Sequence, residues 1–218
     1  MTAGKELALL FAVLFLPGMF AQAGQIDPGA FDSIAYHVQI LVVAIPQVLL
    51  VVAVGDLRRP GSARRYGFRP PDRSDLFATI IGLSATWVTV GLVSVAAGLI
   101  GADTDAMQPA VSWTFDRYEL IPLAAISTLA IGYREEVFFR AFVADRAEEA
   151  GFDARAALGV AALVFAIGHV YQGLAGFVVS LAIGAVLAAV YYRTRSLHGV
   201  AIAHGLYNLL VLLAAGAA

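Results

Sequence analysis

Two adjacent glutamates inside an apolar segment are the residues of this chain whose types and spacing best suit chemistry. Glu135 and Glu136 lie in the stretch Arg134-Glu135-Glu136-Val137-Phe138-Phe139-Arg140, which carries four charges in seven residues. The sequence on both sides is apolar and typical of a membrane helix. A charged side chain at membrane depth costs about 2.5–3.5 kcal/mol even on a lenient insertion scale. Such a cluster persists where it faces a bundle interior or a wet cavity, and it therefore indicates a functional site.

Helical spacing directs the two glutamate side chains to different neighbours. Residues four apart share a helix face, so Glu136 and Arg140 can pair side by side. Glu135 points about 100° away from Glu136 and can face a different neighbour. One carboxylate can thus be held by an internal cation while the other exchanges a proton, as a general base must. A single Glu–Arg pair would indicate a structural ion pair, but two adjacent glutamates with flanking arginines favour a functional site.

Histidines in two later apolar segments could join this cluster. His169 and His204 both lie in predicted membrane spans, and Asn208 follows His204 on the same helix face. At about 1.5 Å per residue, Glu135, His204 and His169 lie about 15, 13 and 21 Å from the inner ends of their spans. These depths are compatible with one cavity reached from the cytoplasm. The other two histidines are predicted to be structural or solvated: His37 and His198.

The composition predicts that membrane helices position these residues. The chain has 218 residues, of which 60% are hydrophobic and 14% charged, with a mean hydropathy of +0.81. A soluble domain would carry about 25% charged residues. We expect an all-α, polytopic membrane helical bundle, a multi-pass protein of the cell membrane, with a single domain over residues 1–218. Seven spans approach the roughly 20 residues that a bilayer core requires: 7–23, 34–54, 76–101, 118–143, 156–173, 176–192 and 197–215.

The distribution of basic residues predicts the orientation of the bundle. The segment 55–75 is rich in arginine: Arg58, Arg59, Arg64, Arg65, Arg69 and Arg73. Because cytoplasmic loops carry the excess of Lys and Arg, this loop is expected inside, with the N-terminus in and the C-terminus out. Aspartates mark the opposite loops: Asp27, Asp32, Asp103, Asp105 and Asp116. The arginine-rich loop is interpreted as a topology determinant, with lipid headgroup binding as a second possibility.

Charge and cysteine content exclude several other classes of function. The chain has 14 basic and 16 acidic residues, a balance that gives no indication of nucleic-acid binding. It has no cysteine, which excludes disulfides, cysteine-ligated zinc and thiol catalysis. The first span, followed by Ala21-Gln22-Ala23, also resembles a signal peptide with its cleavage site. The leader 1–6 has no net positive charge, which favours a retained helix.

Three short motifs, in order and on separate spans, resemble those of a known family. They are Glu135-Glu136-x-x-x-Arg140, Phe165-x-x-x-His169 and His204-x-x-x-Asn208. Together they resemble the motifs of the CPBP intramembrane proteases, which group type II CAAX prenyl endopeptidases with bacterial Abi proteins. The resemblance covers about residues 118–210, the expected catalytic core, while the first three spans match only as generic membrane helices.

The resemblance implies a role for each residue of the three motifs. Glu135 would act as general base on a water, and His169 would orient or activate that water. His204 and Asn208 would stabilise the oxyanion, and Glu136 with Arg140 would brace the helix. Amide hydrolysis needs an activated water and donors for the oxyanion, and this set supplies both. The expected substrate is a membrane-anchored protein or a peptide, and the expected environment is the lipid bilayer.

Metal dependence and two other functions stay open at this point. Glu135, His169 and His204 could bind Zn²⁺ with a water in the fourth position. No His-Glu-x-x-His motif is present, however, and we favour a metal-free glutamic mechanism. A non-catalytic immunity or scaffold protein would keep the same cluster but tolerate Glu135→Gln. A small proton-coupled transporter could also use intramembrane Glu and His, but the chain has no two related halves.

Overall fold

A computed structural model describes residues 2–23, 27, 29–101 and 114–215, and no strand occurs in this part of the chain. The predicted all-helical fold is confirmed. Seven long helices correspond to the seven predicted spans: α1 (Ala3–Ala23), α2 (Ile34–Arg58), α4 (Arg73–Leu99), α5 (Ile121–Glu136), α7 (Ala154–Ile167), α8 (Gly173–Thr194) and α9 (Leu197–Ala215). Two short helices complete the connections: α3 (Ser62–Tyr66) and α6 (Ala144–Glu149). Asp103 and Asp105 lie outside the described residues.

Five of these helices are long and apolar enough to cross a membrane, judged by length and composition. They are α1, α2, α4, α8 and α9. Helix α7 is apolar but has only 14 residues, and α5 carries the charged cluster. The chain is therefore a membrane protein, whereas the number of seven crossings and their orientation remain predictions.

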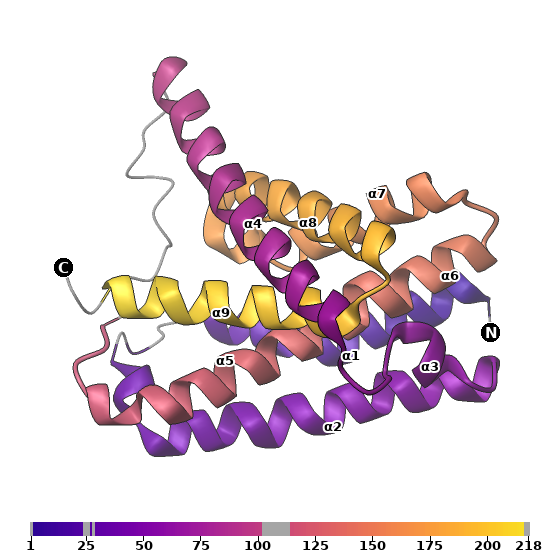
Figure 1. The fold of residues 1–218 in the computed structure, drawn as a ribbon, viewed down its shortest axis with the longest axis horizontal. Coiled ribbons are helices and arrows are strands. Elements are labelled where there is room, and N and C mark those ends of the chain that lie inside the picture. The colour runs from indigo at the N-terminus through magenta and orange to yellow at the C-terminus, as the bar shows by residue number, and fades with distance from the viewer. Residues whose placement is uncertain (1, 24–26, 28, 102–113, 216–218) are drawn as a thin grey trace.

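The helices that carry the motifs lie in the middle of the bundle. Helices α1, α2, α5 and α9 run roughly parallel to one another, and α4 crosses α8 and α9 obliquely (Figure 1). Helix α5 packs between α2 and α9, and α7 and α8 form an antiparallel pair. The three motif-bearing segments therefore converge from α5, from the end of α7 and from α9.

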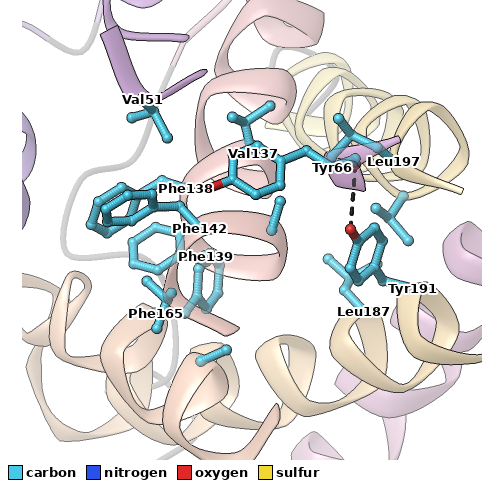
Figure 2. Packing of buried hydrophobic residues seen from close by; sticks show 14 of the residues in the cluster. Val51, Tyr66, Val137, Phe138, Phe139, Phe142, Phe165, Leu187, Tyr191 and Leu197 are labelled. Carbon is cyan, nitrogen blue, oxygen red and sulfur yellow. Dashed lines mark hydrogen bonds between the residues drawn. The ribbon is translucent and has the colours of Figure 1, made fainter. Parts of the chain in front are cut away.

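Phenylalanine rings surround the helix that carries the glutamates. Phe138, Phe139 and Phe142 are fully buried, and Phe165 of α7 packs beside them (Figure 2). The Phe139 and Phe165 ring centroids lie 5.1 Å apart with perpendicular planes. On the other side, Phe15 of α1 lies 4.8 Å from Phe139. Rings of this size bury large apolar areas and favour edge-to-face geometry, so they fix the glutamate helix between α1 and α7.

The predicted span 118–143 is helical throughout, but the type of helix changes in its second half. Helix α5 ends at Glu136, and a π-helix, η4 (Val137–Val143), follows it before α6 begins. All seven residues of η4 are buried. Segments of π-helix are rare and occur frequently at functional sites. Residue periodicity did not predict this change, because Arg140 is the single polar residue of Val137–Val143 and one residue cannot reveal the pitch of a helix.

The predicted span 156–173 is wrong at its C-terminal end. Helix α7 ends at Ile167, and a 3₁₀ turn, η5 (Val170–Gln172), leads into α8. His169 precedes this turn with φ −113° and ψ 7°, so it lies between two helices rather than in the core of one. Gly173, with φ +81°, marks the end of the turn and was the sequence signal for it.

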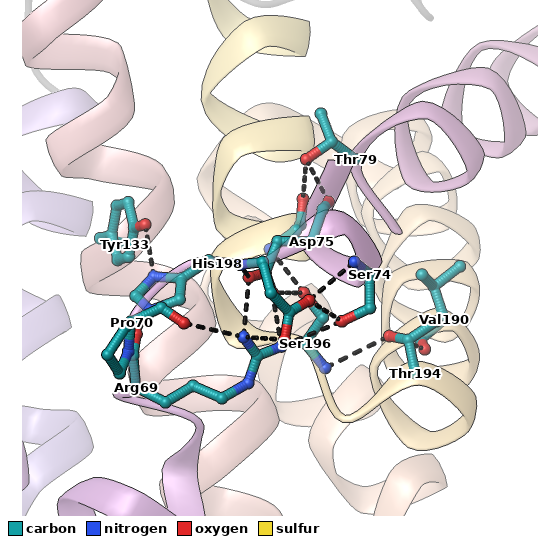
Figure 3. A network of polar contacts seen from close by, with 12 residues as sticks. Arg69, Pro70, Ser74, Asp75, Thr79, Tyr133, Val190, Thr194, Ser196 and His198 are labelled. Atoms are coloured by element: carbon teal, nitrogen blue, oxygen red, sulfur yellow. Dashed lines mark hydrogen bonds and ion pairs between the residues drawn. The ribbon is translucent and has the colours of Figure 1, made fainter. Parts of the chain in front are cut away.

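Side chains of the arginine-rich loop are largely paired with carboxylates. Ion pairs join Arg58 to Glu6, Arg59 and Arg65 to Asp145, and Arg69 to Asp75. Figure 3 shows the Asp75 carboxylate among Arg69, Ser74 and Ser196. These contacts tie the loop to α1, α4 and α6, and to Ser196 directly before α9.

Two histidines have the structural roles predicted for them. His198 Nε2 donates to the Arg69 carbonyl at 2.8 Å, and its Nδ1 accepts from the Tyr133 hydroxyl at 2.7 Å (Figure 3). His37 is fully buried, with ring nitrogens 2.8 Å from Ser127 Oγ and 2.8 Å from the Phe31 carbonyl. Both nitrogens of each ring are occupied, so neither histidine is free for chemistry.

Candidate active site

Two glycines bring α5 and α9 close enough for their motif residues to meet. A Cβ on Gly132 would lie 2.5 Å from the Ala201 carbonyl oxygen, and a Cβ on Gly205 would lie 2.8 Å from Leu129 Cα. Small residues at a helix crossing let the backbones approach closely. Glu136 lies about one turn after Gly132, and His204 directly precedes Gly205. The crossing therefore places Glu136 beside His204.

A chain of polar contacts runs from Arg140 to Glu135. Arg140 Nε lies 3.0 Å from Glu136 Oε2, which confirms the predicted i,i+4 pair. Glu136 Oε1 lies 2.8 Å from His204 Nδ1, and His204 Nε2 lies 3.8 Å from Glu135 Oε2. Glu136 and Arg140 are fully buried. Glu136 thus holds His204 in addition to Arg140, a contact that the sequence did not predict.

These contacts determine which nitrogen of each site histidine is free. A carboxylate can only accept a hydrogen bond, so His204 Nδ1 donates to Glu136 and Nε2 faces Glu135. His169 Nδ1 donates to the Phe165 carbonyl at 2.8 Å, which leaves its Nε2 free as an acceptor in the neutral ring. Both histidines therefore present Nε2 and use Nδ1 as an anchor.

The ring of Phe165 joins residues from three elements of the site. The Arg140 guanidinium lies 4.6 Å from its centroid, the His169 ring 4.5 Å and the His204 ring 5.9 Å. His169 and Glu135 lie within electrostatic range of each other. Phe165 belongs to the second motif, but its side chain had no role in the sequence interpretation. The structure brings together Glu135, Glu136, Arg140, His169 and His204 around it.

Glu135 has a different cation from the one that holds Glu136. Its side chain is 10% exposed, and Arg134 Nη2 lies 3.3 Å from its Oε1. The sequence left Arg134 without a role. Asn208 lies on α9 about one turn beyond His204 and is partly buried. In the described part of the chain no hydrogen bond occupies the Asn208 amide, so its donors are available to a bound group.

The cluster does not have the form of a three-ligand metal centre. Among the residues that the structure describes, no group of three or more His, Asp or Glu side chains is placed to hold a metal ion. The Nδ1 atoms of His204 and His169 are held by Glu136 and by the Phe165 carbonyl, which leaves both Nε2 atoms free. Glu135, His169 and His204 are thus not preassembled as a zinc site in the described residues, and metal dependence stays a prediction.

A buried glutamate facing fixed histidines inside a membrane bundle defines a candidate intramembrane hydrolase. Residues 117–210 match the family model described as type II CAAX prenyl endopeptidase Rce1-like. The matched segment includes every predicted site residue, and it confirms the resemblance drawn from the three motifs. A family of this kind implies a hydrolase of the CAAX protease type. No curated protein and no solved structure matches the chain.

Proposed function

We propose that the chain is an intramembrane endopeptidase that hydrolyses a peptide bond near the cytoplasmic face of the cell membrane. One observation carries this proposal: Glu135 faces His204 Nε2 at 3.8 Å, while Glu136 is fully committed to Arg140 and His204. The two carboxylates are thus divided into one reacting group and one brace. The family match over residues 117–210 supports a peptidase of this class.

Glu135 would begin the reaction by accepting a proton from a water molecule. His169 would orient that water through its free Nε2, since its Nδ1 is held by the Phe165 carbonyl at 2.8 Å. The hydroxide forms a bond to the carbonyl carbon, and the carbonyl electrons move to the oxygen. Glu135 then returns the proton to the amide nitrogen as the carbon–nitrogen bond breaks, which leaves a carboxylic acid and an amine.

His204 and Asn208 would stabilise the oxyanion that forms between these steps. Carboxylates lie 2.8 and 3.8 Å from the two His204 nitrogens, and their charge favours the imidazolium form, in which Nε2 carries a proton. The Asn208 amide supplies a second donor from the next turn of α9. Fixed donors aimed at a developing charge contribute the largest share of many rate enhancements.

The substrate that fits this site is a peptide or a membrane-anchored protein, and the proposed chemistry needs no metal. Every step assigned above uses Glu135, His169, His204 or Asn208. We expect purified, active protein to contain less than one equivalent of zinc and to resist chelators. Metal analysis and cleavage assays with and without a chelator test this expectation, and loss of cleavage on chelation would overturn it.

Comparison of protein termini in living cells tests the proposed function. Cells producing the wild type, Glu135→Gln, His169→Ala or the control Glu148→Gln are compared by mass spectrometry of newly formed termini. Glu148 is exposed at the end of the same continuous helix, so its variant controls for the substitution itself. We expect termini that disappear with Glu135→Gln and His169→Ala but persist with Glu148→Gln.

The same variants separate the two other functions. A scaffold or immunity protein would keep its cellular phenotype in Glu135→Gln without any change of termini. A proton-coupled transporter would lose proton uptake in vesicles, again without a change of termini. Either result would replace the peptidase proposal.

A further inference from the structure

Arg134 is a charged side chain of the bundle to which the proposed reaction gives no role. Its Nη2 contacts Glu135 Oε1 at 3.3 Å, and its side chain is 22% exposed. Its Nε is buried and has no hydrogen-bond partner among the described residues. The guanidinium is therefore held by the charge of Glu135 and by the side chain against which it packs.

Arg134 packs against the aromatic ring of Phe15 in α1, a residue far from it in sequence. The Arg134 guanidinium carbon lies 5.0 Å from the centroid of Phe15. Phe15 is itself buried and lies 4.9 Å from Phe138 and 4.8 Å from Phe139. A cation within about 6 Å of a ring face is attracted by the ring quadrupole. Phe15 thus provides a rigid platform, and it lies outside the segment that matches the peptidase family.

We propose that Arg134 is a positioning residue that keeps Glu135 in the carboxylate form, and that Phe15 of α1 holds Arg134 in place. This inference rests on the proposed function, because a general base must be ionised before it can accept a proton from water. Burial in an apolar site favours the neutral acid, and a nearby cation opposes that effect. Helix α1 would then be part of the catalytic unit.

The other charged groups around Glu135 each have a second partner. Arg140 of η4 lies 3.0 Å from Glu136. His204 of α9 lies 2.8 Å from Glu136 through Nδ1, and its Nε2 lies 3.8 Å from Glu135. His169, at the end of α7, binds the Phe165 carbonyl through Nδ1. Within the described part of the chain, Arg134 forms an ion pair with Glu135 and with no second carboxylate. Its charge is thus directed at the reacting group.

Infrared titration of purified protein in lipid nanodiscs tests the inference without any substrate. The carboxylic-acid band of Glu135 is followed against pH and assigned by its loss in Glu135→Gln. Four variants are compared: Arg134→Gln, Arg134→Lys, Phe15→Leu and the control Phe11→Leu. Phe11 stacks on Phe15 at 5.7 Å and packs 6.4 Å from Phe138, but its ring is not on Arg134. Circular dichroism checks that each variant folds.

We expect Arg134→Gln to raise the proton affinity of Glu135 about tenfold or more. Arg134→Lys should restore most of the wild-type titration, and Phe15→Leu should shift it in the same direction as Arg134→Gln but less. Phe11→Leu should leave it unchanged. An unchanged titration in Arg134→Gln would overturn the inference, as would equal shifts in Phe11→Leu and Phe15→Leu. If Arg134→Gln does not fold, the two phenylalanine variants carry the comparison.

The titration and the cleavage experiment can reject the two proposals independently of each other. A shift of the Glu135 titration without any Glu135-dependent cleavage would reject the peptidase function and leave the electrostatic role of Arg134 in place. Cleavage that depends on Glu135, together with an unchanged titration, would reject the role of Arg134 alone.

Discussion

Glu136 and Arg140 form a fully buried ion pair. Removal of one member of such a pair strongly destabilises a protein. The Arg140 side chain is 0% exposed, and its contacts in the described residues are Glu136 at 3.0 Å and the Phe165 ring at 4.6 Å. Removal of one partner leaves a buried charge without compensation. Replacement of both partners avoids this penalty. The pair is thus better understood as a device that orients His204 than as a source of stability.

We therefore expect Arg140→Leu to destabilise the protein by about 3–5 kcal/mol, because Glu136 is left as a buried, unpaired carboxylate. The double variant Glu136→Gln with Arg140→Leu should recover a large part of this loss. Denaturant unfolding in detergent, followed by circular dichroism, measures both. Arg155→Leu, at an exposed position on α7, serves as the control. Simple additivity of the two single changes would contradict the expectation.

At the scale of helices, the crossing of α5 and α9 determines the geometry of the site. Gly132 and Gly205 meet where the backbones touch, and each has a motif residue within one turn. A methyl group at either position would force the helices apart. The contact of 2.8 Å between Glu136 and His204 depends directly on this spacing.

Gly205→Ala is expected to cost about 1–3 kcal/mol, as overpacking of a tight interface does. It should also lower cleavage activity, because His204 moves away from Glu136. Gly91→Ala in α4 is the matched control, since a Cβ there meets nothing within 4 Å. That control should be neutral or stabilising by about 1 kcal/mol, because Ala favours the helix over Gly. Unfolding midpoints and the cleavage assay are measured for both Gly205→Ala and Gly91→Ala. An equal response of the two variants would contradict the prediction.

The sequence predicted the helical fold and the contacts that local spacing can encode. The pairing of Glu136 with Arg140 follows from i,i+4 geometry, and the structure confirms it. The contact of Arg134 with Phe15 and that of Glu136 with His204 join different helices. Periodicity along one helix says nothing about such contacts, since tertiary packing decides them. The end of α7 before His169 was missed, although Gly168 and Gly173 border the turn, because apolar segments lie directly on both sides of it.

At the scale of the whole molecule, α1 is tied to the bundle both near its N-terminal end and at the site. Glu6 is 3% exposed and lies 2.5 Å from Arg58 Nη2 and 3.6 Å from Arg146 Nη1. Higher on the same helix, Phe15 supports Arg134. These contacts make α1 an integral part of the helical bundle.

Glu6→Gln should therefore weaken the bundle by about 1–3 kcal/mol, because two buried or partly buried arginines lose a charged partner. Deletion of residues 1–23 should have a larger effect and also abolish cleavage. Lys5→Gln is the control, since Lys5 is exposed on the same turn of α1. Thermal unfolding and the cleavage assay measure these effects. Full activity of the deleted protein would show that α1 has no part in the site.

The short helix α7 has a consequence for the membrane around it. Fourteen residues rise about 21 Å, whereas the hydrocarbon core of a bilayer is about 30 Å thick. If α7 starts at the inner boundary, the turn at His169 ends below the outer one. Lipids next to this turn must shorten or tilt, since exposed backbone is not tolerated in hydrocarbon. Hydrolysis should then respond to acyl-chain length, with an optimum in bilayers thinner than average. Cleavage rates in vesicles of graded chain length measure this preference for a thin membrane.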